Sequence, residues 1–199
     1  MNNYYIIGHD YNGKYADMDD WEGNQNIVKL STIGKTEEIL QEDKLIGVIK
    51  TKKKIPDVIN CCIWVISNRI KSIIESVKSD GIHFWQFDIK VIKKNEILKN
   101  YYLMSFTKEI DNKNFIDFNK SIIKFMIERA EINKDYSLIR DFKKLHILEN
   151  NSVQFDIFQL SSPHWIFISD NLKQKFDEQK VTGFTYTTIE EYNERWGKK

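Results

Sequence analysis

The sequence predicts an α+β protein with a mostly antiparallel or mixed sheet, few helices and two similar strand–helix–strand units. Three observations support this prediction. Short apolar segments are numerous along the 199 residues. Residues 85–91 alternate apolar and polar side chains, which is the period of a half-buried strand. Only two segments carry apolar residues at helical spacing, and each directly follows an apolar, strand-like run.

The first helix is expected over about residues 67–79. Its N-terminus is predicted at Ser67, because a serine hydroxyl can accept a hydrogen bond from an unpaired N–H of the first turn. Gly81 stands where a glycine ends such an element. Apolar residues occupy positions i, i+3, i+4 and i+7 and form one stripe: Ile70, Ile73, Ile74 and Val77.

The second helix is expected over about residues 169–179, with Leu172 and Phe176 facing inward. Ser169 repeats the capping serine and Gly183 repeats the terminating glycine at the same spacing. An apolar strand precedes each serine, and another follows each glycine. The similarity has two explanations, an internal duplication or convergence on the same cap and glycine, and the sequence leaves both open.

Further strands are predicted wherever short apolar or alternating runs lie between polar segments. Segment 84–92 is expected to pair with 101–106 as an antiparallel hairpin with a long loop at 93–100. Segment 10–26 is polar and contains glycines, so it is expected to be a loop. The remaining strand candidates are residues 4–7, 27–30, 45–50, 122–127, 145–148, 153–160 and 165–168.

The composition points to one ordinary globular domain over residues 1–199, with 1–55 a looser N-terminal lobe and 60–190 the core. The 30 basic and 29 acidic residues give a net charge of +1, which argues against a dedicated nucleic-acid binder. Cys61 and Cys62 are adjacent, so they do not form a spaced disulfide framework. The N-terminus lacks the pattern of a signal peptide, and no apolar run could span a bilayer. A cytoplasmic protein without membrane contact is expected.

No catalytic, metal or cofactor motif occurs in the sequence. The histidines form no HExxH pair, and the cysteines lack the spacing of a zinc site. No glycine-rich phosphate loop and no nucleophile elbow is present. We therefore expect no enzyme activity, no metal and no cofactor. Two alternatives stay open: an enzyme that uses His83 or His164 with a carboxylate at a strand end, and a nucleic-acid binder that uses the basic residues Lys50, Lys52, Lys53 and Lys54.

One charged segment is a candidate partner-binding surface. Acidic side chains in residues 10–22 far outnumber the single Lys14, and aromatic side chains lie between them. Exposed carboxylates can steer a basic partner, and aromatic side chains frequently anchor one. The alternative is a solvated loop. The candidate contact residues are Tyr15, Asp17, Asp19, Asp20, Trp21 and Glu22.

Four blocks of the chain resemble a widespread bacterial domain that is classed among the immunity proteins of polymorphic toxin systems. They are Val-Ile-Ser-Asn-Arg-Ile at 65–70, Tyr-Tyr-Leu-Met at 101–104, Ile-Asp-Phe-Asn-Lys-Ser at 116–121, and the segment 166–172 that leads to 181–186. The resemblance covers roughly residues 60–190. It departs from the family after the Tyr-Tyr-Leu strand, where the family often carries Asn and this chain has Met104 and Ser105.

The resemblance implies a function that consists of binding and involves no catalysis. A member of this family would bind a cognate toxin domain, a protein partner, in the cytoplasm of the producing cell and inhibit it stoichiometrically. Such an inhibitor needs a folded scaffold and a complementary surface, which agrees with the lack of catalytic motifs. The acidic segment at 10–22 is then the first candidate for the toxin-binding surface.

Overall fold

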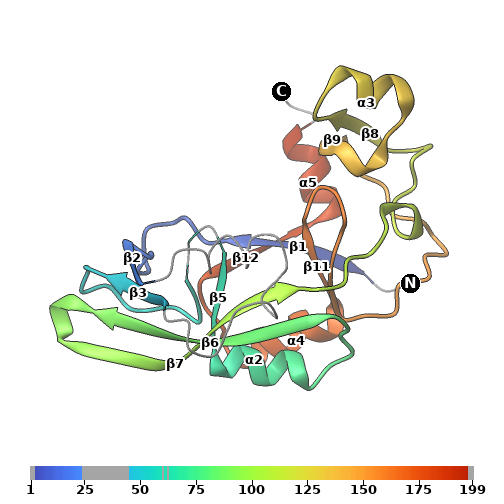
Figure 1. Ribbon diagram of the computed structural model, residues 1–199. Helices are drawn as coiled ribbons and strands as arrows, with labels where there is room; N and C mark the ends of the chain where they lie inside the picture. Colours follow the sequence, from blue (N-terminus) through green and yellow to red (C-terminus); the bar gives the residue numbers. More distant parts are fainter. Residues whose placement is uncertain (1–2, 24–44, 60, 62, 197–199) are drawn as a thin grey trace. The chain divides into compact units, whose positions relative to one another are not determined.

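The computed structural model describes residues 3–23, 45–59, 61 and 63–196 (Figure 1). The predicted α+β class with a mixed sheet is confirmed, because short helices accompany three sheets in the described chain. The strands are β1 (Tyr4–His9), β2 (Asp20–Gly23), β3 (Leu45–Ile49), β4 (Val58–Ile59), β5 (Trp64–Ser67), β6 (Ile82–Val91), β7 (Glu96–Phe106), β8 (Ile122–Phe125), β9 (Ile139–Lys144), β10 (Ile157–Gln159), β11 (Ile166–Ser169) and β12 (Phe184–Thr188). The α-helices are α2 (Asn68–Glu75), α3 (Glu128–Asn133), α4 (Asp170–Glu178) and α5 (Ile189–Trp196).

The chain forms two compact units, and each is assembled from stretches that are distant in the sequence. Unit 1 consists of Met1–Gly8, Glu109–Lys173 and Tyr186–Lys199. Unit 2 consists of His9–Lys108 and Gln174–Thr185. The expected single domain with a looser lobe at 1–55 stays a prediction, and the two units are described separately below.

Unit 2 contains a six-stranded sheet in the order β2-β3-β6-β7-β5-β4. Its pairs are antiparallel except β3 with β6, which are parallel. The hairpin of β6 and β7 is the longest pair, and it extends from Ile82 opposite Phe106 to Val91 opposite Glu96. The prediction of a long loop at 93–100 is wrong, because β7 begins at Glu96. Asn95 adopts the left-handed conformation at φ 50°, which asparagine tolerates, so the chain reverses within a short turn.

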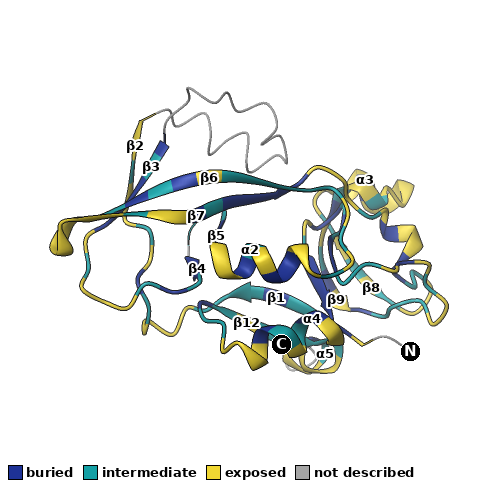
Figure 2. Cartoon of the chain, turned by 90° about the horizontal axis from the view of Figure 1, so that it is seen from below, coloured by how far each residue is buried: buried dark blue, intermediate teal, exposed yellow. Residues whose placement is uncertain are grey.

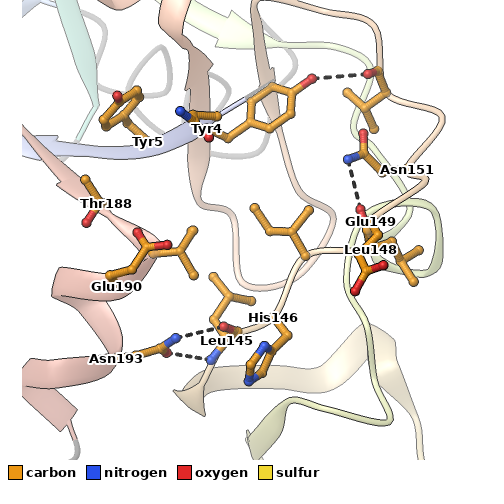
Figure 3. A pocket seen from close by; sticks show the side chains of 14 residues that line it. Tyr4, Tyr5, Leu145, His146, Leu148, Glu149, Asn151, Thr188, Glu190 and Asn193 are labelled. Carbon is orange, nitrogen blue, oxygen red and sulfur yellow. Dashed lines mark hydrogen bonds between the residues drawn. The ribbon is translucent and has the colours of Figure 1, made fainter. Parts of the chain in front are cut away.

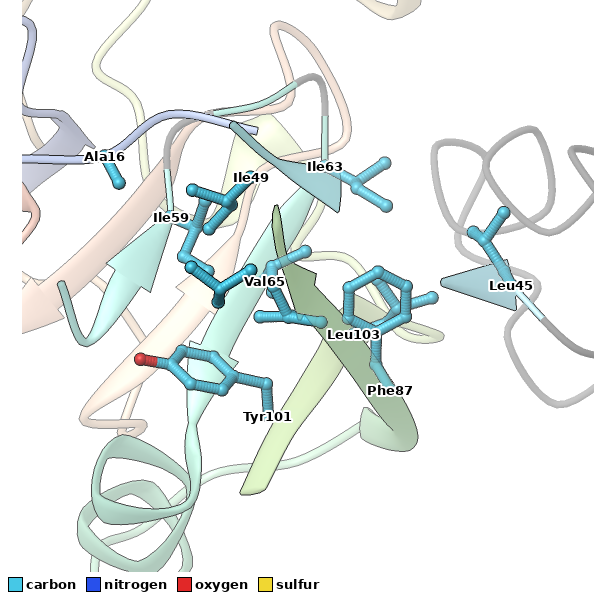
Figure 4. Close-up of a cluster of buried hydrophobic side chains, with 11 residues drawn as sticks. Ala16, Leu45, Ile49, Ile59, Ile63, Val65, Phe87, Tyr101 and Leu103 are labelled. Carbon is cyan, nitrogen blue, oxygen red and sulfur yellow. The ribbon is translucent and has the colours of Figure 1, made fainter. Parts of the chain in front are cut away.

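The buried side chains of unit 2 come both from α2 and from the sheet. Ile70, Ile73 and Ile74 of α2 are buried, as the apolar stripe predicts, whereas the opposite face is exposed (Figure 2). Each such side chain contributes about 1.5–3 kcal/mol on burial. A second layer of strand side chains surrounds Phe87 and Leu103 and is drawn in Figure 4. The helix ends at Glu75, earlier than the predicted 79.

Unit 1 contains a four-stranded sheet in the order β10-β11-β1-β12 and a two-stranded sheet of β8 and β9. Its core is rich in aromatic rings. Phe115 packs edge-on against Tyr4, Phe158 and Phe167 at centroid separations of 5.3, 4.9 and 5.0 Å. Edge-to-face contacts of this kind add to the stabilisation that burial provides.

The two strand–helix–strand segments share more than a sequence pattern. In unit 2 the four neighbouring strands are ordered β4-β5-β7-β6, and in unit 1 they are ordered β10-β11-β1-β12. In both, an antiparallel pair leads into a helix, and the strand after the helix lies two positions away across an inserted strand. In unit 2 the inserted strand is β7, which follows the segment in the sequence. In unit 1 it is β1, at the start of the chain. This correspondence supports the duplication more than the shared cap residues do.

Other predicted elements differ from the structure. Residues 145–148 are not a strand and form a single bridge, Ile116 with Ile147. The predicted loop at 10–26 contains β2, and the candidate strand at 27–30 lies outside the described residues. The helices α3 and α5 and the strand β9 were not predicted. For α3 no apolar stripe was available, because only Ala130 of its six residues is buried.

Candidate functional site

The acidic segment borders one edge of the sheet in unit 2. Among the described strands, β2 is the edge strand and pairs antiparallel with β3. Tyr15 and Trp21 are half-buried. The four predicted acidic contact residues are exposed: Asp17, Asp19, Asp20 and Glu22. The carboxylates are therefore accessible to a partner, and the aromatic side chains mainly serve the fold.

Most of these carboxylates already have partners within unit 2. Lys50 Nζ lies 3.3 Å from Asp20 Oδ2, and Lys90 Nζ lies 3.1 Å from Glu22 Oε1. The backbone N–H of Lys50 donates to Asp19 Oδ2 at 2.6 Å. Exposed ion pairs contribute little to stability, so a partner's basic side chains can exchange with these lysines at small cost.

The aromatic residues of the segment attach it to the rest of unit 2. The ring centroids of Trp21 and Phe87 are 5.8 Å apart, and Trp21 packs on the buried cluster. Tyr15 forms an isolated bridge with Lys54. The basic run at 50–54 thus lies beside the acidic segment. The neighbouring carboxylates lower the positive potential of the basic run, which argues against the nucleic-acid alternative.

The predicted cap Ser67 and the residue before the predicted Gly183 meet at one carboxylate, that of Asp57. Asp57 Oδ1 accepts from Ser67 Oγ at 3.0 Å and from Arg69 Nε at 3.1 Å, and Asp57 Oδ2 accepts from Thr182 N and Oγ1 at 3.0 and 2.9 Å. Burial acts to raise the pKa of Asp57, but the hydrogen bonds from Arg69, Thr182 and Ser67, together with the charge of Arg69, outweigh it and lower the pKa. Ser67 also accepts from the backbone N–H three residues later. Asp57 therefore joins the start of α2 to the loop that carries Gly183.

In unit 1, the second strand–helix–strand segment has a similar pair of a capping serine and a carboxylate. Ser169 Oγ accepts from the backbone N–H of Leu172 at 3.3 Å and donates to Asp156. Asn171 Nδ2 also donates to Asp156, at 3.1 Å. Gly81, the terminating glycine of the first copy, has φ +64° and lies against Lys108. These hydrogen bonds and backbone conformations are those of helix caps and of the turns that follow the helices.

A pocket of about 600 Å³ lies entirely within unit 1 (Figure 3). This volume is in the usual range for pockets that bind a ligand. Three stretches line it: the start of β1 at Asn3, Tyr4 and Tyr5, the extended segment 145–153, and the junction of β12 with α5 at Thr188, Ile189, Glu190 and Asn193. Sequence reasoning did not single out any of these stretches as a site.

The wall of the pocket formed by residues 145–151 is held by side chains together with a short backbone contact to residues 115–117. Asn193 Oδ1 accepts from Leu145 N at 2.7 Å, and Asn193 Nδ2 donates to Leu145 O at 2.9 Å. Ser121 Oγ accepts from His146 N at 2.9 Å. Asn151 Nδ2 donates to the Leu148 carbonyl at 3.1 Å. The backbone of residues 115–117 supplies two further bonds, from Asp117 N to the His146 carbonyl and from Leu148 N to the Phe115 carbonyl, both at 2.9 Å. This contact amounts to a single bridge and not a ladder, so the predicted strand at 145–148 does not form.

The third wall of the pocket begins a helix with a capping box. Thr188 Oγ1 accepts from Glu191 N at 3.0 Å, and Glu191 Oε2 accepts from Thr188 N at 2.9 Å. This reciprocal pair fixes the first turn of α5. The Thr-x-x-Glu pattern at 188–191 was the sequence signal that could have revealed this helix.

The polar lining of the pocket is acidic. The lining residues in the described chain include Glu149 and Glu190 but neither Lys nor Arg. Lys120 Nζ lies 3.2 Å from Glu149 Oε1, and hydrogen bonding to this carboxylate raises the pKa of Lys120. Within the described residues, the carboxylate of Glu190 has no ion pair or hydrogen bond, and the ring of His146 has no hydrogen-bond partner.

The histidines of the enzyme alternative do not lie in this pocket. His83 lies on β6 opposite Ser105, and His164 is at the surface with its Nδ1 2.8 Å from Glu109 Oε1. His9 stacks on Trp64 at a centroid distance of 4.5 Å. In the described chain, no group of three His, Cys, Asp or Glu side chains is arranged to hold a metal ion. The helices of the described residues are too short or too polar to cross a membrane.

The fold and these surfaces define an α+β protein with one acidic sheet edge and one acidic pocket. Comparison with family models places the protein: residues 8–191 match the Immunity protein family (Imm11), and the chain belongs to this family. The match begins well before the 60–190 range of the resemblance seen in the sequence, so it includes the acidic segment. No curated protein matches the chain.

Proposed function

We propose that the protein neutralises a cognate bacterial toxin domain by binding it stoichiometrically in the cytoplasm of the producing cell. The observation that carries this proposal is the family match, which extends over residues 8–191 and hence over both units. An immunity protein of this kind acts by occupying or covering the active site of its toxin and needs no chemistry of its own.

The acidic segment supplies one surface suited to this role. Asp17, Asp19, Asp20 and Glu22 present negative charge along the β2 edge, and that charge would speed the approach of a basic toxin. Trp21 contributes through the fold, because it packs on the buried cluster. A test of this surface must therefore leave Trp21 in place.

The test is co-expression with the toxin domain encoded immediately upstream. We expect a bacterial host to survive toxin expression only when this protein is also present, and the two proteins to co-purify. A toxin that is harmless alone, or that kills regardless of this protein, would contradict the proposal.

The contribution of the acidic surface is measured with the double variant Asp20→Asn/Glu22→Gln. If the surface steers the toxin, the variant slows association and reduces the salt dependence of the rate. Asp80→Asn is the matched control, because Asp80 is an exposed carboxylate of unit 2 that pairs with Lys108 away from β2. An unchanged association rate in the double variant would remove this surface from the interface.

A further inference from the structure

We infer that the pocket of unit 1 receives a basic side chain, arginine or lysine, from a loop of the toxin. This inference rests on the proposed function, because the toxin is the partner that would supply the side chain. It goes further by naming a second contact site and the chemistry of its ligand.

The pocket suits a long side chain with a cationic end. Its floor contains the buried residues Tyr4, Leu145 and Val153, whose apolar surface can contact an aliphatic stem. Its rim carries Glu190 on one side and Glu149 on the opposite side (Figure 3). Arginine combines an apolar stem with a planar donor group that pairs well with carboxylates, and it is enriched among residues that dominate interfaces.

The charges around the pocket favour a cation over an anion. Glu190 and the neighbouring Glu191 lie in the first turn of α5, so they more than offset the partial positive charge of that helix end. Lys120 is bound to Glu149, and Lys173 lies over the ring of Tyr5 at 5.5 Å. Glu190 is thus the lining carboxylate that an incoming cation can pair with directly.

The walls of the pocket are fixed before any partner binds. The side chains of Asn193, Ser121 and Asn151 hold the segment 145–151, and the capping box holds the start of α5. A preformed pocket reduces the ordering cost of binding and allows one inserted side chain to contribute strongly.

The first experiment tests the pocket without the toxin. The full-length protein is titrated with N-acetyl-arginine methylamide and, in parallel, with the neutral analogue that has citrulline in place of arginine, while backbone amide NMR signals are followed. We expect saturable shifts at 145–151 and 188–193 with the arginine compound only, weakened at least about tenfold in Glu149→Gln/Glu190→Gln. Absence of these shifts, or equal shifts with the citrulline compound, would overturn the inference.

The second experiment uses the toxin domain with the same double variant. Binding should weaken by roughly a hundredfold, because the variant removes Glu190, which pairs with the inserted cation, and the negative charge of Glu149 on the opposite rim. Glu194→Gln is the control, since Glu194 is an exposed carboxylate on the same helix outside the pocket lining, and it should bind as the unmodified protein does. Thermal unfolding of all variants should match, because Glu149 and Glu190 are exposed.

The outcomes separate the two proposals. If the unmodified protein neutralises the toxin and Glu149→Gln/Glu190→Gln binds it equally tightly, the pocket inference fails and the immunity function stands. If the unmodified protein binds the arginine compound but does not neutralise the toxin, the immunity function is contradicted, and the toxin is no longer the source of the side chain.

Discussion

Asp57 connects three parts of unit 2 through one carboxylate, whose side chain is only 13% exposed. We predict that Asp57→Ala lowers the free energy of unfolding by about 2–4 kcal/mol, because several charge-assisted hydrogen bonds are lost together. Denaturation in urea measures this change. Asp80→Asn is the control, since its exposed ion pair with Lys108 should contribute little to the free energy of unfolding.

The same residue makes the stability dependent on pH. The pKa of Asp57 is lowered in the folded protein, so its contribution is complete above the pKa of the unfolded chain, about 3.9, and is lost as the pH falls through the lower folded value. We expect the stability of the unmodified protein to fall more steeply below about pH 4 than that of Asp57→Asn. Parallel acid profiles for the two proteins would contradict this role.

Gly183 illustrates a residue whose identity is fixed by its surroundings. Its φ is +99°, and an added Cβ would lie 2.0 Å from the Val58 carbonyl oxygen. We predict that Gly183→Ala destabilises the protein by about 3 kcal/mol or more, from the unfavourable φ and the overlap together. Gly13 has φ +73° with no atom within 4 Å of an added Cβ, so Gly13→Ala should cost only about 1–2 kcal/mol. Equal losses for the two variants would show that the overlap is relieved without cost.

At the scale of elements, the end of α4 gives a prediction with opposite signs at two nearby lysines. Lys180 follows the helix at φ 50°, a conformation that favours glycine, whereas Lys175 lies inside α4. Lys180→Gly should therefore stabilise the protein by up to about 1 kcal/mol, and Lys175→Gly should destabilise it by about 1 kcal/mol. Chemical denaturation of both variants checks the signs, and a loss of stability in Lys180→Gly would contradict the assignment of this helix end.

Elements with a strong local pattern could be predicted from the sequence, and elements that depend on distant partners could not. The helix after Ser67 combines a cap with an apolar stripe, and both features are local. By contrast, residues 145–148 have the composition of a strand, but their backbone bonds are shared between the side chains of Asn193 and Ser121 and a single bridge to residues 115–117. The short edge strand β2 lacks an apolar run that would predict it from the sequence. It forms because it pairs with β3.

The same distinction applies to the candidate site. The acidic segment could be identified because its carboxylates lie close together in the sequence. The structure shows that one of its aromatic residues, Trp21, packs on Phe87. The pocket could not be identified, since its lining comes from three stretches that only the fold of unit 1 brings together. Of the four histidines, His146 is the one that lines it, and no local pattern distinguished this residue.

At the scale of the whole molecule, the described residues include an acidic surface on unit 2, along β2, and an acidic pocket in unit 1. The carboxylates of β2 are exposed and paired with lysines, which suits steering of a partner. The pocket of unit 1 is concave and held rigidly, which suits a specific anchor.

The most direct test of this account is the stoichiometry and activity of a mixture of the purified toxin domain with increasing amounts of this protein. The account predicts that toxin activity falls linearly to zero at a fixed molar ratio, with a complex of that ratio in light scattering. Loss of toxin activity at catalytic amounts of this protein would indicate an enzyme, and full activity at excess would contradict the immunity function.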